Sequence, residues 1–158
     1  MVNVSINLIV TIEDTEDFLR ASDVIYDMLK VDENGLPKNL SFVCPYAVLS
    51  CYTIESGIKN LLIKNNISFN REHDLLKLFE LLPNSYKRRV FSLENAFWNQ
   101  GIYKEVPEEI FKSLLDKTKT NFINARYFFE QKTNDVEICV VFLKTVSHAI
   151  FDMLKEEN

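Results

Sequence analysis

The stretch from Cys44 to Asn65 limits, more than any other, what this chain can fold into. Its apolar residues fall at positions all around a helix: Val48, Leu49, Cys51, Ile54, Ile58, Leu61 and Leu62. A helix that is apolar on almost every side is buried at the centre of its domain. Pro45 fits the first turn of such a helix, where a backbone N–H is not needed. We therefore expect this segment to be the central helix of a bundle.

Helical spacing also precedes this segment. From Asp14 onward, apolar residues recur at intervals of three and four, which predicts an amphipathic helix. These residues are Phe18, Ala21, Ile25, Met28 and Leu29. Residues 1–12 contain several β-branched side chains and fit either a short strand or the opening of the first helix. The segment from Asp32 to Asn39 contains an Asn-Gly pair and a proline, which predict a turn.

Two shorter helices are predicted after the central one. The first begins near His73 and ends near Pro83, because proline cannot continue a helix. Its buried side consists of Leu75, Leu78, Phe79 and Leu82. Asn84 is suited to cap a second helix, from about Ser85 to Asn99.

The remaining sequence predicts two more helices. Pro107 and the acidic residues that follow it favour a helix start, and the pattern continues to Gln131. Its predicted inward side consists of Phe111, Leu115, Thr118, Phe122, Ala125 and Phe129. Asn134 and Glu137 resemble a capping box, with Asn in place of Ser or Thr, for a last helix that reaches Lys155.

Glycine and proline are rare, with three and four residues among 158. Sheet proteins with many turns need more of both, so this scarcity favours long helices. The length suits one domain, and neither a repeat nor a linker interrupts the chain. We therefore expect a single all-α domain over residues 1–158, folded as an up-and-down bundle of five or six helices.

The charge balance argues against a generally basic nucleic-acid binder, because the net charge is −5. A local basic groove is compatible with this balance. The densest basic cluster is "YKRRV", from Tyr86 to Val90, and a looser one contains Lys112, Lys117 and Lys119. A solvated helix face explains both clusters as well as an RNA contact does.

Cysteines and hydropathy predict a cytoplasmic location. Cys44, Cys51 and Cys139 all lie in apolar stretches without the spacing of a disulfide framework, so we interpret them as small core residues in a reducing compartment. The N-terminal sequence lacks the features of a signal peptide. No apolar run reaches the roughly 20 residues that span a bilayer, so we expect no membrane association.

Glu55 and Lys59 stand out because they interrupt the apolar central helix. They are four residues apart with the acid first, which is the favourable order for an ion pair on a helix. Glu55 shares a helix face with Cys51 and Ile58, so it is expected to border the core. A buried carboxylate is costly unless it has a partner. The flexible stem of Lys59 can carry its ammonium out to water, which leaves room for a second cation.

Arg126, Tyr127 and Glu130 interrupt the penultimate helix in the same way. Arginine offers a fixed charge and a planar set of donors, which suits a buried carboxylate. We hypothesise that Glu55, Lys59, Arg126, Tyr127 and Glu130 form one polar network between two facing helices. The alternative is a set of boundary salt bridges that only fix how the helices pack.

The two histidines are candidates of unequal interest. His73 lies at or near a helix start and suits either a site residue or a simple rim residue. His148 has Lys144 and Asp152 at offsets of four, which is typical of a solvated face, so no chemistry is assigned to it. Two distant histidines without paired cysteines make no zinc site, and no glycine-rich phosphate loop is present. We expect neither a metal nor a cofactor.

Three segments in order resemble the HEPN-domain proteins (higher eukaryote and prokaryote nucleotide-binding): "CYTIESGIKNLLIKNN", "REHDLLKLFELLP" and "FINARYFFEQ". The residues that match the family's motifs are Glu55, Lys59, His73, Arg126, Tyr127 and Glu130. The resemblance covers the chain from about Phe42 to its end. It implies an up-and-down helical bundle, often a homodimer, that is connected with RNA.

The resemblance also implies a cellular context and an activity. Many family members are metal-independent endoribonucleases in toxin–antitoxin, abortive-infection or CRISPR-type defence systems. Their active site is an arginine followed by a histidine, with four to six residues between them, at the dimer interface. In this sequence no arginine has a histidine at that distance.

Three functions therefore stay open on sequence grounds. The first is a non-enzymatic module that binds RNA, a nucleotide or a protein, usually as a homodimer. The second is an atypical metal-independent endoribonuclease that uses His73 and Arg126 as catalytic residues. The third is an adaptor that contacts a protein partner encoded nearby and no nucleic acid.

Overall fold

The computed structural model describes residues 11–99, 107–126 and 138–157, with the side chains of 94–99 and 120–126 left out. The described residues form six α-helices and one short 3-10 helix. These elements are α1 (Ile12–Leu29), η1 (Leu40–Phe42), α2 (Val43–Lys64), α3 (Leu75–Leu81), α4 (Asn84–Asn99), α5 (Glu108–Arg126) and α6 (Val140–Glu156). The prediction of an all-α bundle is confirmed.

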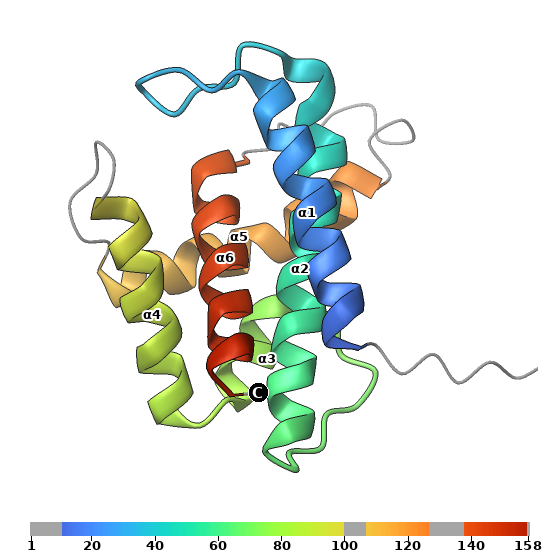
Figure 1. Ribbon diagram of the computed structural model, residues 1–158, viewed down its shortest axis with the longest axis vertical. Helices are drawn as coiled ribbons and strands as arrows, with labels where there is room; N and C mark the ends of the chain where they lie inside the picture. The colour runs from blue at the N-terminus through green and yellow to red at the C-terminus, as the bar shows by residue number, and fades with distance from the viewer. Residues whose placement is uncertain (1–10, 100–106, 127–137, 158) are drawn as a thin grey trace, which may run out of the picture.

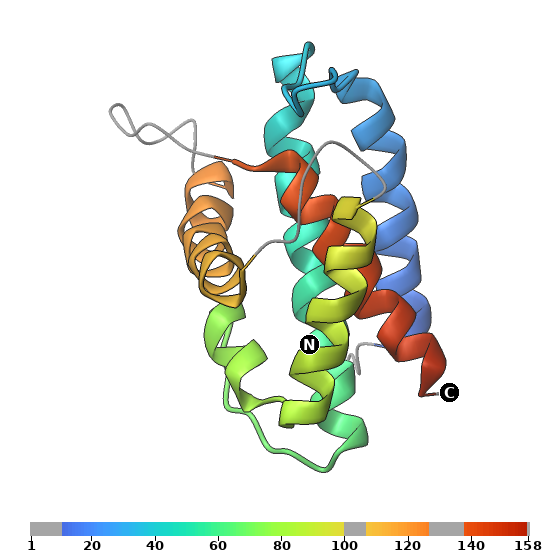
Figure 2. The same ribbon diagram turned by 90° about the vertical axis from the view of Figure 1, so that its left-hand side faces the viewer.

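Four helices run along the length of the bundle. In Figure 1, α1 and α4 run in one direction, and α2 and α6 run in the opposite direction. Helix α5 crosses behind them, and α3 lies near the end of the bundle where α2 finishes. Figure 2 shows α1 and α5 on opposite sides of the layer that contains α2 and α6.

The central position predicted for α2 is confirmed. It packs against α1, α3, α5 and α6 along its length. Ile54, Ile58, Leu61 and Leu62 are fully buried. At Gly57, a Cβ atom would clash with Cγ2 of Ile150, so α2 and α6 approach each other too closely for a side chain at this position.

Helix α1 begins with a capping box that the hydrophobic pattern did not reveal. The Thr11 side chain accepts a hydrogen bond from the Asp14 backbone N–H at 3.1 Å, and the Asp14 carboxylate accepts one from the Thr11 backbone N–H at 2.7 Å. These bonds satisfy two donors at the helix start. The ambiguous segment 1–12 lies almost wholly outside the described residues.

The buried side of α1 differs from the predicted one. Ala21 and Met28 are exposed, although the spacing predicted them on the inward face. Thr15 and Ser22 are buried instead. The Thr15 hydroxyl donates to Ser56 Oγ at 3.0 Å and accepts from Asn60 Nδ2 at 3.2 Å. Small polar residues can occupy a helix interface when they hydrogen-bond across it, so hydrophobicity alone misplaced the face.

Helices α3 and α4 agree closely with their predicted ranges, and α5 begins where it was predicted to begin. Helix α3 ends at Leu81, and its predicted buried residues Leu75, Leu78, Phe79 and Leu82 are all buried. Phe111, Leu115 and Thr118 form the buried side of α5 as expected. The other three residues predicted for that side, together with residues 127–131, lie outside the described side chains. Helix α6 begins at Val140 with Cys139 as its N-cap, so the predicted helix start at Asn134 is wrong; Asn134 and Glu137 themselves lie outside the described residues.

Phe111 joins four helices at one point. Its ring centroid lies 5.2 Å from that of Phe79 on α3, 5.8 Å from that of Phe91 on α4 and 5.6 Å from that of Phe142 on α6. The planes are tilted or perpendicular, which is the favourable arrangement for aromatic pairs. Phe111 itself is fully buried on α5. This aromatic cluster holds the crossing helix α5 against the rest of the bundle.

The sequence predicted that all three cysteines lie in the core, but one of them does not. Cys51 is buried and Cys44 is partly buried, but Cys139 is exposed because it sits at the end of the bundle before α6. Burial, with the nearby Glu55 carboxylate, raises the pKa of the Cys51 thiol well above its ordinary value. Such a thiol is inert, so Cys51 is a packing residue. Among the described helices, none is both long and apolar enough to cross a membrane.

Candidate functional site

Glu55 is the centre of a polar site on the buried side of α2. Only 7% of the residue is exposed, yet it has two cationic or ionisable partners. Lys59 Nζ lies 2.5 Å from Glu55 Oε1, and His73 Nδ1 lies 2.8 Å from the same oxygen. The carboxylate therefore accepts hydrogen bonds from two directions and is not left unpaired in the core.

Lys59 stays inside the molecule and does not extend to water. Its side chain is only 16% exposed. Its ammonium lies 5.7 Å from the ring centroid of Phe69, in the loop between α2 and α3. The contact with Glu55 and the aromatic ring together explain why the flexible stem is held inward. The ion pair predicted from the spacing of the two residues is confirmed.

His73 is the exposed member of the site. It lies just before α3, and its side chain is 68% exposed although its Nδ1 is bound to Glu55. The Glu72 carboxylate accepts hydrogen bonds from the backbone N–H groups of His73 at 3.0 Å and Asp74 at 2.9 Å, which fixes the chain at this point. Within the described residues, Nε2 of His73 has no hydrogen-bond partner. The site thus offers one free imidazole nitrogen to solvent in a fixed orientation.

Asp74 joins this site to α5. Its Oδ1 accepts from the backbone N–H groups of Leu76 and Lys77 and so caps α3, while Oδ2 lies 3.2 Å from Lys119 Nζ. Burial alone would raise the pKa of the Asp74 carboxyl, but the hydrogen bonds from the Lys77 backbone and the Lys119 ammonium outweigh it, and the pKa lies below its ordinary value. The segment that carries His73 is therefore anchored to both α2 and α5.

Replacing Asp74 with asparagine should reduce stability most near neutral pH. A carboxyl whose pKa is lower in the folded state contributes stability above its unfolded pKa of about 3.9, and that contribution is lost as the pH falls through the folded value. Asparagine keeps the cap but not the charge, so we expect a loss of about 1 kcal/mol at pH 7 that disappears in acid. Urea unfolding between pH 2 and 7 measures this difference.

Asp74→Ala is the matched comparison, because it removes both the cap and the charge. It should cost about 1 kcal/mol more than Asp74→Asn at every pH. A difference between wild type and Asp74→Asn that stays the same at pH 2 and pH 7 would contradict the ion pair with Lys119.

The predicted contact between Glu55 and Arg126 stays a prediction. Helices α2 and α5 do pack against each other, and Arg126 is the last residue of α5. Its side chain lies outside the described part of the chain, as do Tyr127 and Glu130. The structure brings Glu55, Lys59 and His73 together, so half of the predicted site is assembled without those three residues.

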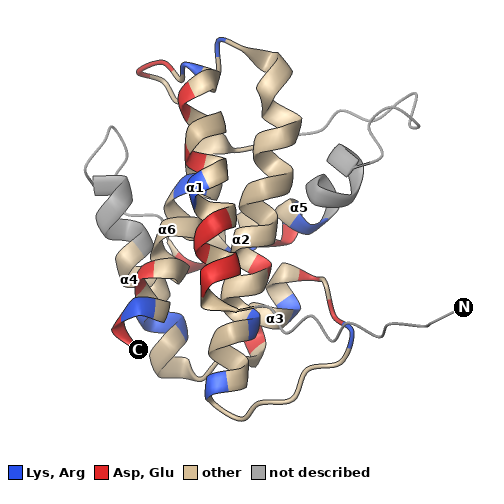
Figure 3. Ribbon diagram, turned by 45° about the vertical axis from the view of Figure 1, so that its right-hand side comes forward, with Lys and Arg blue, Asp and Glu red and all other residues tan. Residues whose placement is uncertain are grey.

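The basic clusters of the sequence are largely neutralised by carboxylates. Lys87 and Lys112 both contact Glu80, at 3.2 and 3.0 Å, and Arg89 contacts Glu156 on α6. Figure 3 also shows acidic residues gathered on the N-terminal half of α1. Within "YKRRV", Arg88 is exposed and has no carboxylate partner among the described residues. A broad basic face for nucleic acid is therefore absent from the described surface of α4.

His148 has a partner that the sequence did not indicate. We interpreted it as part of a solvated face on α6, but its Nε2 lies 2.9 Å from Asp23 Oδ1 on α1, and its side chain is only 27% exposed. The two residues are 125 positions apart. The spacing of Lys144 and Asp152 around His148 does not predict this contact, because it depends on how α1 packs against α6.

The site as described contains an ammonium, an imidazole and carboxylates. In residues 11–99, 107–126 and 138–157, no three His, Cys, Asp or Glu side chains are close enough to hold a metal ion. The imidazole of His73 can form hydrogen bonds and can transfer a proton. Comparisons with protein-family models, with curated proteins and with solved structures found no match to this chain.

Proposed function

We propose that this chain is a HEPN-like helical module that binds RNA or a nucleotide through its phosphate, with His73 as a contact residue. One observation carries the proposal: the exposed His73 imidazole is held at Nδ1 by the buried Glu55 carboxylate, at 2.8 Å. A fixed imidazole with a free Nε2 donates a hydrogen bond to a phosphate oxygen when it is protonated. The motif positions shared with HEPN-domain proteins agree with this role.

Binding of this kind should be local and only weakly dependent on salt. The net charge is −5, and most lysines near the site already pair with carboxylates. For single strands, the logarithm of the affinity falls with the logarithm of the salt concentration by about 0.7 for each phosphate neutralised. A site with one or two phosphate contacts therefore has a shallow salt dependence, unlike that of a broad basic groove.

The proposal is tested with a fluorescently labelled single-stranded RNA and measurements of anisotropy. A charge-assisted hydrogen bond contributes about 1.5–3 kcal/mol, so His73→Ala should weaken binding by about 10- to 100-fold. His148→Ala is the matched control, because it removes the only other histidine, which is paired with Asp23 on the α1–α6 side. Equal affinities for wild type and His73→Ala would contradict the proposal.

A second candidate function is metal-independent cleavage of RNA at the same site. It is favoured by the Glu55–His73 contact, because in many active sites a carboxylate orients the imidazole that acts as the general base. The free Nε2 would then take the proton of a ribose 2′-OH, and Arg126 would stabilise the phosphate. Loss of general base catalysis lowers rates by about 10²–10⁴-fold, so cleavage in the presence of a chelator should disappear in both His73→Ala and Arg126→Ala.

The same resemblance extends the proposal to the cellular context. It includes a homodimer, a place in a prokaryotic defence or toxin–antitoxin system, and a protein partner encoded nearby. If the protein neither binds nor cleaves RNA in these experiments, the results favour an adaptor that contacts a protein partner and no nucleic acid.

A further inference from the structure

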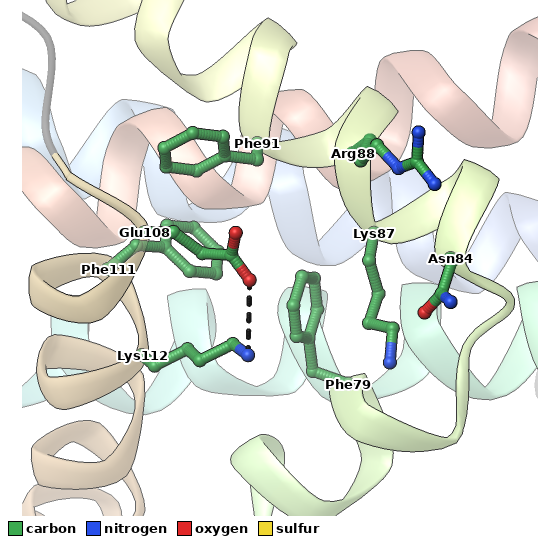
Figure 4. Close-up of a pocket in the computed structure, with 8 residues that line it drawn as sticks. All are labelled: Phe79, Asn84, Lys87, Arg88, Phe91, Glu108, Phe111 and Lys112. Atoms are coloured by element: carbon green, nitrogen blue, oxygen red, sulfur yellow. Dashed lines mark ion pairs between the residues drawn. The ribbon is translucent and has the colours of Figure 1, made fainter.

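A cavity of about 270 Å³ lies between α3, α4 and α5, at the end of α3 away from His73 (Figure 4). This volume is close to the lower end of the range for small-molecule sites. We call it the aromatic pocket, because Phe79, Phe91 and Phe111 are among the residues that line it. Neither Glu55 nor His73 contributes to it, so it is separate from the site described above.

Cationic side chains also line the aromatic pocket. Lys87 and Arg88 from α4 and Lys112 from α5 line it, with Glu108 as the only carboxylate among the lining residues. Lys112 Nζ lies 3.1 Å from Glu108 Oε1. Arg88 is exposed and has no carboxylate partner in the described part of the chain, and Figure 4 shows its guanidinium pointing away from the phenylalanine rings. The pocket therefore combines apolar rings with an excess of cations.

Glu80 shows that two of these cations, Lys87 and Lys112, can hold an anion between two helices. One of its oxygens lies 3.2 Å from Lys87 Nζ on α4, and the other lies 3.0 Å from Lys112 Nζ on α5. The hydrogen bond from Lys112 is the main reason why the pKa of the Glu80 carboxyl is below its ordinary value. Glu80 is itself half exposed, so a carboxylate or phosphate from solution can compete with it for the two lysines.

We propose that the aromatic pocket binds a small molecule consisting of a flat aromatic ring and one anionic group. The ring packs against Phe79 and Phe91, which favours aromatic over aliphatic ligands. The anionic group displaces Glu80 from Lys87 and Lys112, and the exposed Arg88 side chain turns toward it. The small volume fits one or two fused rings. An aryl acid and a nucleoside monophosphate share this chemistry, so the experiment must distinguish these two sources.

The test is a calorimetric titration of the intact protein with three kinds of probe. Indole-3-acetate and phenyl phosphate represent aryl anions, and adenosine monophosphate represents nucleotides. Indole and acetate, which carry the ring and the charge separately, are the chemical controls. We expect saturable binding of at least one of the ring-bearing anions and none of indole or acetate at the same concentrations. The probe with the highest affinity shows whether the pocket prefers an aryl acid or a nucleotide.

Three variants test whether the ligand binds in the aromatic pocket. Arg88→Ala should weaken binding about fivefold, which corresponds to loss of one exposed charge pair, whereas Arg71→Ala, an exposed arginine in the loop before α3, should leave it unchanged. Glu80→Gln should strengthen binding several-fold, because it frees both lysines. A purely structural role for Glu80 would weaken binding or leave it unchanged.

Two results would overturn the proposal: no binding of any ring-bearing anion at millimolar concentration, or binding that is insensitive to Arg88→Ala. His73→Ala should not change binding to the aromatic pocket, so failure of this proposal and failure of the proposed RNA contact are distinguishable. Thermal unfolding checks whether the Glu80→Gln variant folds. If it does not fold, the test depends on Arg88→Ala alone.

Discussion

Phe111→Ala is expected to lower the free energy of unfolding by about 3–5 kcal/mol, the range for truncation of a buried aromatic ring. The ring is fully buried and contacts Phe79, Phe91 and Phe142 on three other helices. Its removal leaves a cavity at the point where α5 crosses the bundle, and the surrounding rings cannot all move inward to fill it. Urea unfolding monitored by circular dichroism measures the loss.

Ile110→Ala is the matched control for this prediction. Ile110 is the neighbouring residue on α5 and is 50% exposed, so its truncation should change stability by no more than about 0.5 kcal/mol. Phe111→Leu keeps most of the apolar volume and should fall between the two. A loss below about 1 kcal/mol for Phe111→Ala would show that α5 does not depend on the aromatic cluster.

The second large effect is expected at the buried ion pair of the site. Lys59→Met removes the ammonium but keeps most of the apolar stem, so Glu55 loses its closest partner inside the bundle. Removal of one partner of a buried pair costs about 3–5 kcal/mol. Because His73 still contacts the carboxylate, we expect a loss near the lower limit, about 3 kcal/mol.

The chain offers a close control in Arg20 and Glu16. This pair has the same spacing of four residues and a distance of 2.6 Å, but the arginine side chain is 74% exposed. Arg20→Met should therefore cost less than about 1 kcal/mol. The double variant Glu55→Gln with Lys59→Met should recover much of the stability lost in Lys59→Met, because no unpaired charge is left. Similar losses for Lys59→Met and Arg20→Met would contradict the buried pair.

The sequence predicted the features that depend on neighbours along the chain. The central helix α2, the buried side of α3 and the Glu55–Lys59 pair all follow from intervals of three or four residues, which are fixed by the geometry of a helix. The capping of α3 by Asp74 follows from a residue preference of similarly short range, although the sequence drew attention to His73 instead.

The features that depend on tertiary packing were not predicted. His73 reaches Glu55 through the loop between α2 and α3, which has no periodicity from which its path can be predicted. The contact of His148 with Asp23 requires knowledge of how α1 packs against α6. For the same reason, the basic clusters that contain Lys87, Arg88 and Lys112 fitted either a solvated helix face or an RNA contact on sequence grounds, although these residues line one pocket with three phenylalanines.

The misplaced face of α1 has a different cause. Thr15 and Ser22 are buried because hydrogen bonds satisfy their hydroxyl groups, to Ser56 for Thr15 and to the Leu19 carbonyl for Ser22. A hydrophobic pattern assigns such residues to the surface, because it does not include the partner that makes their burial tolerable.

Nitrogen-15 NMR of the two imidazoles, recorded during a titration with single-stranded RNA, tests the central claim most directly. The chain contains only His73 and His148, so each signal can be assigned from one alanine variant. If the Glu55-bound imidazole of His73 contacts phosphate, its Nε2 signal shifts and saturates with RNA while the signals of His148 stay unchanged. RNA binding that leaves the Nε2 signal of His73 unmoved would contradict the account.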